Sequence, residues 1–270
     1  MCVIFACGTK LPPEDALEAG AFSNDDGAGL AWLNREKKLV EWKKGLKDHK
    51  EVLEYINKEK IPFPLAIHFR TASVGGKSLL LTHPFPVGEG VPTWLEGTCS
   101  QVLFHNGHLA KWEEIVLQAG LASQEEFPEG PWSDSRGLAW LTHLKGPGVI
   151  RFVNESSRVL LFSSSPDWAP EDDAAEDPWG YFGFWGNWVG KPADGFMQST
   201  TTYANRGGKS LVVWGKSWER GEDESEEAPP AKLPVLPTAN LQNVWSIAEL
   251  QEILAKLEKE LADARTAARG

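Results

Sequence analysis

The first eight residues, Met1-Cys2-Val3-Ile4-Phe5-Ala6-Cys7-Gly8, decide how the rest of this chain is interpreted. The Cys2 side chain is small, so an aminopeptidase can remove Met1 and leave Cys2 with a free α-amine. That residue then carries a thiol with a reference pKa of about 8.5 and an amine at about 7.7–8.0, which supply a nucleophile and a base together. The apolar run after Cys2 predicts a buried strand that holds this terminus. The alternative is a chance Met-Cys start, so the interpretation depends on partners elsewhere.

Composition narrows the class of protein. The chain has 270 residues, of which 41% are hydrophobic and 24% charged, as in a soluble globular protein with one large core. Its net charge of −11 argues against a nucleic-acid or anionic-membrane surface. No apolar stretch approaches the length of a membrane span. Three cysteines, Cys2, Cys7 and Cys99, cannot all pair and lack metal-ligand spacing, which favours a reducing, cytoplasmic location with no metal or cofactor.

The first half of the chain predicts several strands and two helices. Apolar and turn residues indicate an antiparallel strand pair at 30–33 and 38–42 with a turn at 34–37 between them. Helical spacing predicts helices near 16–21 and over 47–57, and an apolar run predicts a strand over 65–69.

Arg70 follows that last strand and is succeeded by small hydroxyl and glycine residues, among them Thr71 and Ser73. A guanidinium holds a carboxylate through two parallel hydrogen bonds, so this stretch suits a loop that grips an anion. The alternative is that Arg70 is a salt-bridging strand terminus. His83, in Thr82-His83-Pro84, is by itself more typical of an ordinary loop or core histidine.

A strand over 100–104 runs into His105-Asn106-Gly107-His108, and helical spacing follows from Leu109. A strand–Asn-Gly–helix junction leaves the Asn106 amide and the Gly107 N–H free to point at a developing oxyanion. A helix is predicted over 134–145, with Ser133 or Asp134 at its N-cap. Asp134 is interpreted either as a cap or as a carboxylate that binds a substrate ammonium.

These stretches, in this order and spacing, resemble the class II glutamine amidotransferases, the N-terminal-nucleophile glutaminase domains, over roughly residues 1–203. The segments that carry the resemblance are the Met-Cys start, Gly27-Ala28-Gly29-Leu30-Ala31, His68-Phe69-Arg70-Thr71-Ala72-Ser73, Thr82-His83-Pro84, Phe104-His105-Asn106-Gly107 and Ser133-Asp134-Ser135.

The resemblance implies a role for each matched residue. Cys2 is the nucleophile, and Asn106 with Gly107 forms the oxyanion hole. Arg70 binds the α-carboxylate of glutamine and Asp134 its α-ammonium, while His83 lines the glutamine pocket. Thr71 and Ser73 stand in the substrate loop where many members have tryptophan and threonine, which leaves substrate affinity open. The implied fold is α+β, a four-layer αββα N-terminal-nucleophile hydrolase sandwich.

The remaining residues are predicted to form further strands, a linker and a C-terminal helix. Residues 148–153 and 158–162 are predicted as a strand pair, and two more strands are predicted over 181–185 and 196–200. The amidotransferase domain is assigned to residues 1–216 and an acidic, Pro-rich linker to 217–243. Residues 244–270 are predicted as an amphipathic helix that packs on its own domain, binds a partner or self-associates.

The predicted function is that of a glutaminase subunit. Cys2 hydrolyses the glutamine side-chain amide through a thioester and supplies ammonia to a separate acceptor synthase or ligase. The alternatives are a stand-alone γ-glutamyl amide hydrolase and a non-enzymatic adaptor that retains the fold. A chain that keeps Met1 would be inactive under the first two interpretations, because its Cys2 has no free amine.

Overall fold

The computed structural model describes residues 2–167, 176–200, 202–204 and 210–213. The predicted linker at 217–243 and the predicted helix at 244–270 lie outside the described residues. The described chain is a mixed α and β fold, as the sequence predicts. In that part of the chain, no helix combines the length and the apolar character needed to cross a membrane.

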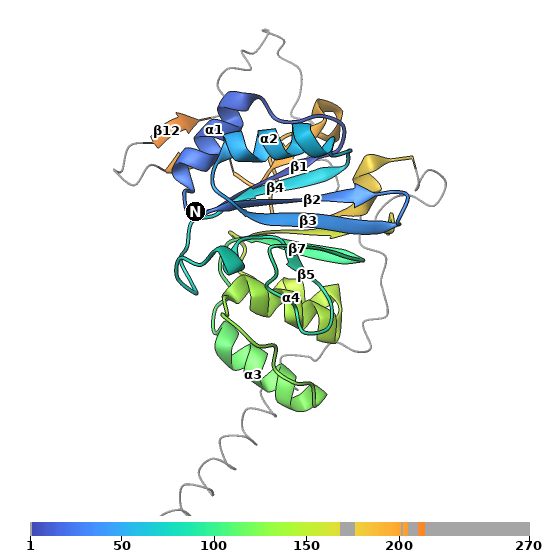
Figure 1. Cartoon of the computed structure of the whole chain (residues 1–270). Coiled ribbons are helices and arrows are strands. Elements are labelled where there is room, and N and C mark those ends of the chain that lie inside the picture. The colour runs from blue at the N-terminus through green and yellow to red at the C-terminus, as the bar shows by residue number, and fades with distance from the viewer. Residues whose placement is uncertain (1, 168–175, 201, 205–209, 214–270) are drawn as a thin grey trace, which may run out of the picture.

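Two antiparallel sheets form the centre of the molecule (Figure 1). The larger sheet has the order β10 (Phe196–Gln198), β1 (Val3–Cys7), β4 (Leu65–Phe69), β2 (Ala28–Asn34), β3 (Leu39–Leu46) and β6 (Glu96–Cys99). The smaller sheet has the order β5 (Phe85–Pro86), β7 (Gln101–Asn106), β8 (Arg158–Ser163) and β9 (Phe182–Trp185). A separate pair joins β11 (Thr202–Ala204) to β12 (Ser210–Val213).

Helices cover the two outer faces of the stacked sheets (Figure 1). On the side of the larger sheet lie α1 (Glu14–Ser23) and α2 (His49–Glu59). On the side of the smaller sheet, α4 (Asp134–Lys145) lies next to the strands and α3 (Trp112–Ser123) packs beyond it. Four 3-10 turns complete the described elements: η1 (Leu79–Leu81), η2 (Pro147–Phe152), η3 (Pro178–Tyr181) and η4 (Pro192–Asp194).

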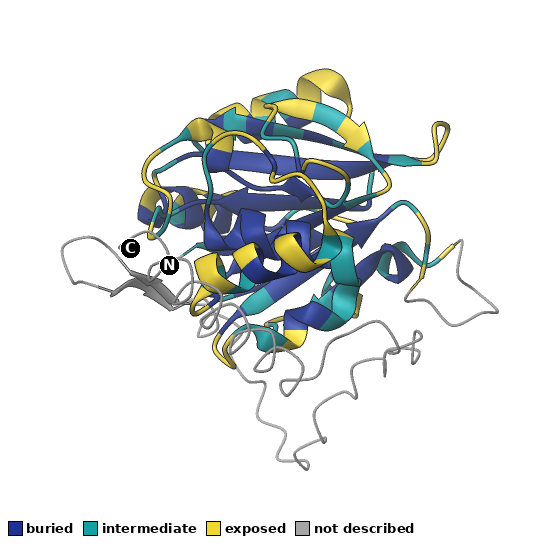
Figure 2. Ribbon diagram, turned by 90° about the horizontal axis from the view of Figure 1, so that it is seen from below, coloured by how far each residue is buried: buried dark blue, intermediate teal, exposed yellow. Residues whose placement is uncertain are grey.

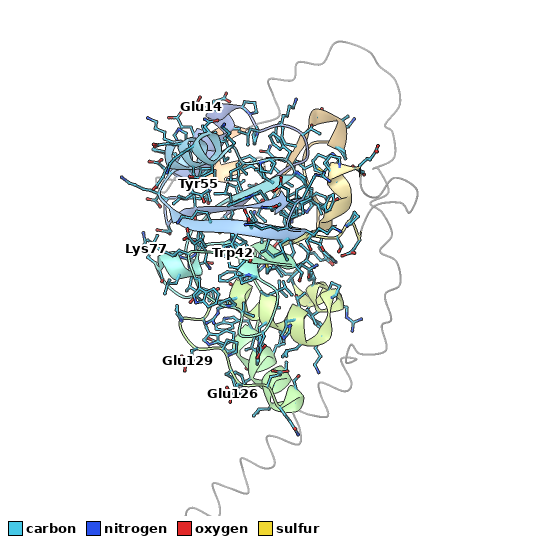
Figure 3. The ribbon with its side chains drawn as sticks, turned by 45° about the vertical axis from the view of Figure 1, so that its right-hand side comes forward. Glu14, Trp42, Tyr55, Lys77, Glu126 and Glu129 are labelled. Atoms are coloured by element: carbon cyan, nitrogen blue, oxygen red, sulfur yellow. The ribbon has the colours of Figure 1, made fainter. Side chains whose placement is uncertain are left out.

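Three apolar layers hold these elements together. Leu17, Val52 and Ile67 belong to the layer between α1, α2 and the larger sheet. The layer between the sheets includes Trp42, labelled in Figure 3, which packs with residues such as Phe104. The third layer joins the smaller sheet to α3 and α4. Figure 2 shows the resulting pattern, with buried strands inside and exposed residues on the outer helical surfaces.

One predicted strand is wrong. Residues 147–152 form the 3-10 turn η2, which begins after Gly146 at φ +78° and has Pro147 in its first turn. The strand β8 pairs instead with β7 on one edge and β9 on the other, so no edge remains for 148–153. A short apolar run does not by itself distinguish a strand from a buried turn, because both place apolar side chains in the core.

The N-terminal strand is central in the larger sheet. All five residues of β1 are buried, and β1 pairs antiparallel with β4 and β10. Val3 lies opposite Phe69, so the residue before β1 and the residue after β4 reach the same end of the sheet. That end carries the candidate site.

Gly29 gives a test of how closely the sheets fit. An added Cβ would lie 2.1 Å from the backbone oxygen of His83. We therefore expect Gly29→Ala to lower the melting temperature by about 5–10 °C, since overpacking costs roughly 1–3 kcal/mol and each kcal/mol shifts a chain of this size by a few degrees. Gly88→Ala is the control, because an added Cβ there meets nothing within 4 Å. Equal melting temperatures in a thermal scan would contradict the expectation.

Candidate active site

Cys2 lies at the start of β1 beside the chain that leaves β4. The Thr71 backbone N–H donates to Cys2 Sγ at 3.4 Å. The Cys2 thiol in turn donates to the Thr71 carbonyl oxygen, also at 3.4 Å. The β1–β4 register ends at Val3 and Phe69, and the thiol contacts the second residue beyond Phe69. The cysteine side chain is therefore held by backbone groups of the loop that begins at Arg70.

Seven of the eight predicted site residues line one narrow pocket at this end of the molecule. They come from the start of β1, the loops after β4, η1 and β7, and the start of α4: Cys2, Arg70, Thr71, Ser73, His83, Gly107 and Asp134. The eighth, Asn106, precedes Gly107 at the end of β7. Five segments that are far apart in sequence thus meet at one edge of the stacked sheets.

Arg70 is buried and bonded to the loop that follows it. Its guanidinium donates to the carbonyl oxygens of Gly76 at 2.8 Å, Val74 at 3.2 Å and Ser78 at 3.4 Å. Among the described residues no carboxylate forms an ion pair with it, so the alternative of a salt-bridging strand terminus is wrong there. Burial lowers the pKa of Arg70. The charge is compensated by carbonyl dipoles, which a ligand carboxylate can replace.

The loop at 71–78 supplies Thr71, Ser73 and Val74 to the lining of the small pocket. Its open volume is about 20 Å³, which is room for about one water molecule. An amino acid is larger than this volume, so its entry requires the pocket to widen. The loop is anchored at its base, where Thr71 Oγ1 donates to Asn24 Oδ1 at 2.7 Å and the Ala72 N–H donates to Asp26 Oδ2 at 2.8 Å. Lys77, labelled in Figure 3, pairs with Asp26 at 2.6 Å and adds a contact near its other end.

Asp134 occupies the first position of α4, and Ser133 is the N-cap that accepts from the Arg136 backbone N–H. Asp134 is therefore not the N-cap of α4, and its carboxylate makes other contacts. Asp134 Oδ1 accepts from the Ser135 N–H at 2.8 Å, and Oδ2 accepts from the Leu109 N–H at 3.2 Å. Oδ2 also lies 3.5 Å from His108 Nδ1. The carboxylate is buried, fixed in orientation by these contacts and part of the pocket lining.

The strand–Asn-Gly junction differs from its prediction in two respects. The Asn106 amide is not free, because Nδ2 donates one hydrogen to Ser199 Oγ at 2.9 Å. The amide carries two hydrogens, so one remains for another acceptor. Glycine is required at position 107 because an added Cβ would lie 2.0 Å from Ser157 Oγ. The helix also begins later than predicted, at Trp112.

Three buried histidines lie at the pocket, of which His83 and His105 line it and His68 packs against His83. The His68 and His83 ring centroids are 4.1 Å apart, and His105 Nδ1 lies 3.1 Å from Ser135 Oγ. Burial lowers the pKa of His68 to about 3 and that of His105 to about 4, and it lowers that of His83 well below its usual value. All three rings are therefore neutral at physiological pH. The His83 ring nitrogens have no hydrogen-bond partner among the described residues.

The cysteines differ in their surroundings. Burial raises the pKa of the Cys2 thiol, against a lowering effect of its Thr71 backbone hydrogen bond. Burial also raises the pKa of Cys99 to about 12 and that of Cys7 further. Cys2 is half-buried and lines the pocket, whereas Cys7 is fully buried inside the sheet. With the thiol protonated, reaction at Cys2 requires a base close to the sulfur.

Sequence reasoning missed several residues of the site. His105 and Ser135 line the pocket although no role was predicted for them, and Leu81 and Val74 supply its apolar wall. His105 and Ser135 stand directly beside predicted site residues, which is a signal that could have identified them. Ser199 was predicted only as a strand residue, because its partner Asn106 is 93 positions away. No cluster of three or more metal-ligating side chains occurs among the described residues.

Comparison with known proteins finds distant structural likeness only. No family model matches the chain, and no curated protein matches it in sequence. The glutamine phosphoribosylpyrophosphate amidotransferase from B. subtilis, complexed with ADP and GMP, is 19% identical at a TM-score of 0.43. The match covers 62% of this chain and 38% of that one.

A second structure, described as the allosteric regulatory enzyme of purine biosynthesis, is 20% identical at a TM-score of 0.43. Its match covers 61% of this chain and 36% of the other. This chain therefore matches less than two fifths of the length of either structure. Both likenesses are too distant to support a function, so the proposal below depends on the geometry of the pocket.

Ser199 gives a test of the site that is independent of function. Its Oγ accepts from the buried Ile4 N–H at 2.9 Å as well as from Asn106. We expect Ser199→Ala to lower the melting temperature by about 2–10 °C, because an unsatisfied buried donor costs roughly 1–3 kcal/mol. Ser156→Ala is the matched control, since Ser156 is exposed and its hydroxyl bonds Asn154, which is also at the surface. A thermal scan that gives the same value for both variants would contradict this role of Ser199.

Proposed function

We propose that this protein is a glutaminase of the N-terminal-nucleophile type, which hydrolyses the side-chain amide of glutamine at Cys2. One observation carries the proposal. A thiol at the start of the first strand shares a narrow pocket with a buried guanidinium, Arg70, and a buried carboxylate, Asp134. A free amino acid carries the complementary pair of charges on its α-carbon, so the two side chains fit an amino-acid substrate.

The raised pKa of the Cys2 thiol supports the need for a base on the same residue. Once Met1 is removed, the α-amine of Cys2 accepts the thiol proton as sulfur attacks the amide carbon. The carbon–nitrogen bond breaks, the proton passes to the leaving nitrogen and ammonia departs. Water then cleaves the thioester, which releases glutamate and restores the thiol. Neutral His83 and His105 do not compete for this proton, because burial lowers the pKa of each ring.

The oxyanion of the tetrahedral intermediate is assigned to the Gly107 N–H and the second hydrogen of the Asn106 amide. The bond from Asn106 Nδ2 to Ser199 Oγ supports this assignment, because it fixes the amide plane before substrate arrives. Thr71 and Ser73 lie in the loop that follows Arg70 and line the pocket, so they are assigned to substrate binding. A preorganised donor of this kind typically contributes about 2.7–4 kcal/mol to barrier lowering.

We further propose that the layered architecture is the αββα sandwich of the N-terminal-nucleophile hydrolases and that it forms a domain over residues 1–216. The layer order helix, sheet, sheet, helix in Figure 1 supports that assignment. The ammonia then serves a separate acceptor enzyme, and residues 244–270 recruit that enzyme or mediate self-association.

Replacement of the nucleophile is the first test. Cys2→Ala should reduce ammonia release from glutamine by on the order of 10⁴-fold or more, since loss of a nucleophile removes the covalent path. Cys7→Ala is the matched control, because Cys7 is buried in β1 and far from any α-amine. Intact mass must first establish that Met1 is absent from the assayed protein. An inactive Cys7 variant beside an active Cys2 variant would overturn the assignment.

Replacement of Arg70 tests substrate recognition. Arg70→Lys should raise KM for glutamine about tenfold or more with a smaller change in kcat, because an ammonium does not reproduce the two-bond grip on a carboxylate. Arg35→Lys serves as control, since Arg35 lies over the Tyr181 ring and does not line the pocket. An unchanged KM in steady-state assays would make Arg70 a structural residue of its own loop.

A substrate comparison distinguishes the remaining functions. The glutaminase proposal predicts faster ammonia release from glutamine than amine release from γ-glutamyl amines. The opposite order would assign the pocket to a γ-glutamyl amide hydrolase with an open leaving-group side. Protein that has lost Met1, keeps its melting transition and hydrolyses neither substrate would favour the non-enzymatic adaptor.

A further inference from the structure

Lys44 lies behind the pocket and is almost fully buried, at 1% exposure. It lies near the C-terminal end of β3, and its Nζ donates to the carbonyl oxygens of Leu80 at 3.1 Å and Pro84 at 3.4 Å. The same ammonium lies 4.8 Å from the centroid of the Phe85 ring. The two hydrogen bonds attach Lys44 to both ends of one short segment, residues 80–84.

That stretch carries two residues of the pocket, Leu81 and His83. Further contacts from the same strand hold it in place. The Gly45 N–H donates to Thr82 Oγ1 at 3.2 Å, and Thr82 Oγ1 donates to the Leu79 carbonyl oxygen at 2.6 Å. On the neighbouring strand β2, the missing side chain of Gly29 leaves room for the His83 backbone oxygen. Strands β2 and β3 together form the surface on which residues 80–84 pack.

The charge of Lys44 is unmatched. None of its contacts within the described residues is an ion pair with a carboxylate. A buried ammonium that is held by carbonyl dipoles and a ring face contributes little to stability, and an apolar residue of similar volume is often as stable or more so. Fold stability therefore does not explain a lysine at this position, whereas its directed hydrogen bonds do.

We propose that Lys44 is a positioning residue, whose side-chain nitrogen Nζ fixes the segment at 80–84 so that Leu81 and His83 form one wall of the Cys2 pocket. Its effect on substrate binding rests on the proposed function. Its effect on the segment does not. Without the two hydrogen bonds, the segment loses its attachment at both ends and the pocket wall becomes mobile.

The protonation of Lys44 gives an independent signature. Burial, followed by the nearby charge of Arg136 on α4, lowers the pKa of Lys44 to about 7 from 10.5. His83 is the other titratable group that faces it. Between pH 7 and 10.5 the unfolded chain binds the lysine proton and the folded chain does not, so the free energy of unfolding rises with pH over this range. Lys44→Met should remove that part of the rise.

The test compares Lys44→Met with Lys43→Met, the adjacent lysine, which pairs at the surface with Glu96. In Lys44→Met we expect amide hydrogen exchange across 80–84 to accelerate about tenfold or more, with a melting temperature at pH 6 that is not lower than that of wild type. KM for glutamine should rise about tenfold while kcat stays within about threefold. Lys43→Met should change neither exchange nor KM.

Thr82→Val and Thr82→Ser form a second pair, in case Lys44→Met does not fold. The valine variant removes the two hydrogen bonds of Thr82 Oγ1, to the Gly45 N–H and the Leu79 carbonyl oxygen, whereas serine retains them. Only valine should therefore accelerate amide exchange at 80–84. Unchanged exchange at 80–84 in Lys44→Met, or in Thr82→Val, would overturn the proposal. If the wild-type protein hydrolyses no glutamine, the proposed function fails, and the exchange data still decide the role of Lys44.

Discussion

The structure depends on the antiparallel pairing of β1 between β4 and β10. This pairing places β1 inside the sheet, with a neighbouring strand on each side. The backbone hydrogen bonds of β1 are therefore satisfied on both sides, and its five buried side chains enter two apolar layers. As a result the residue just before β1 has a fixed position, which a terminal nucleophile requires and a frayed end does not provide.

The end of the larger sheet where Cys2 lies collects several buried basic groups beside the carboxylates of Asp26 and Asp134. Arg70 and Lys44 are charged or titratable groups compensated mainly by backbone carbonyl oxygens, and the three histidines are kept neutral by burial. Asp134 is the carboxylate that lines the pocket. This arrangement is costly in desolvation, since several polar groups are buried with few strong partners. Such a cost is typical of functional sites, where binding rather than stability determines the residues present.

Local patterns explain the elements whose prediction succeeded. The helix Asp134–Lys145 with its Ser133 cap follows from capping chemistry and apolar spacing within one short window. The buried strand at Val3–Cys7 and the hairpin of β2 and β3 follow in the same way from apolar runs and turn residues. The strand prediction at 148–153 failed because strands and buried turns share the pattern of an apolar run. Both edges of β8, the expected partner, are already paired with β7 and β9.

The sequence by itself determined which residue types are available for chemistry, and the order of its motifs indicated that Cys2, Arg70, Asn106 and Asp134 belong together. Only the tertiary structure decided their partners. Arg70 bonds loop carbonyl oxygens, Asn106 bonds a serine 93 residues away, and Lys44 is buried behind the pocket. The physical reason is that helix and strand signals arise from neighbouring residues. Hydrogen-bond partners across a core depend instead on which backbone groups the long-range strand pairing brings within reach.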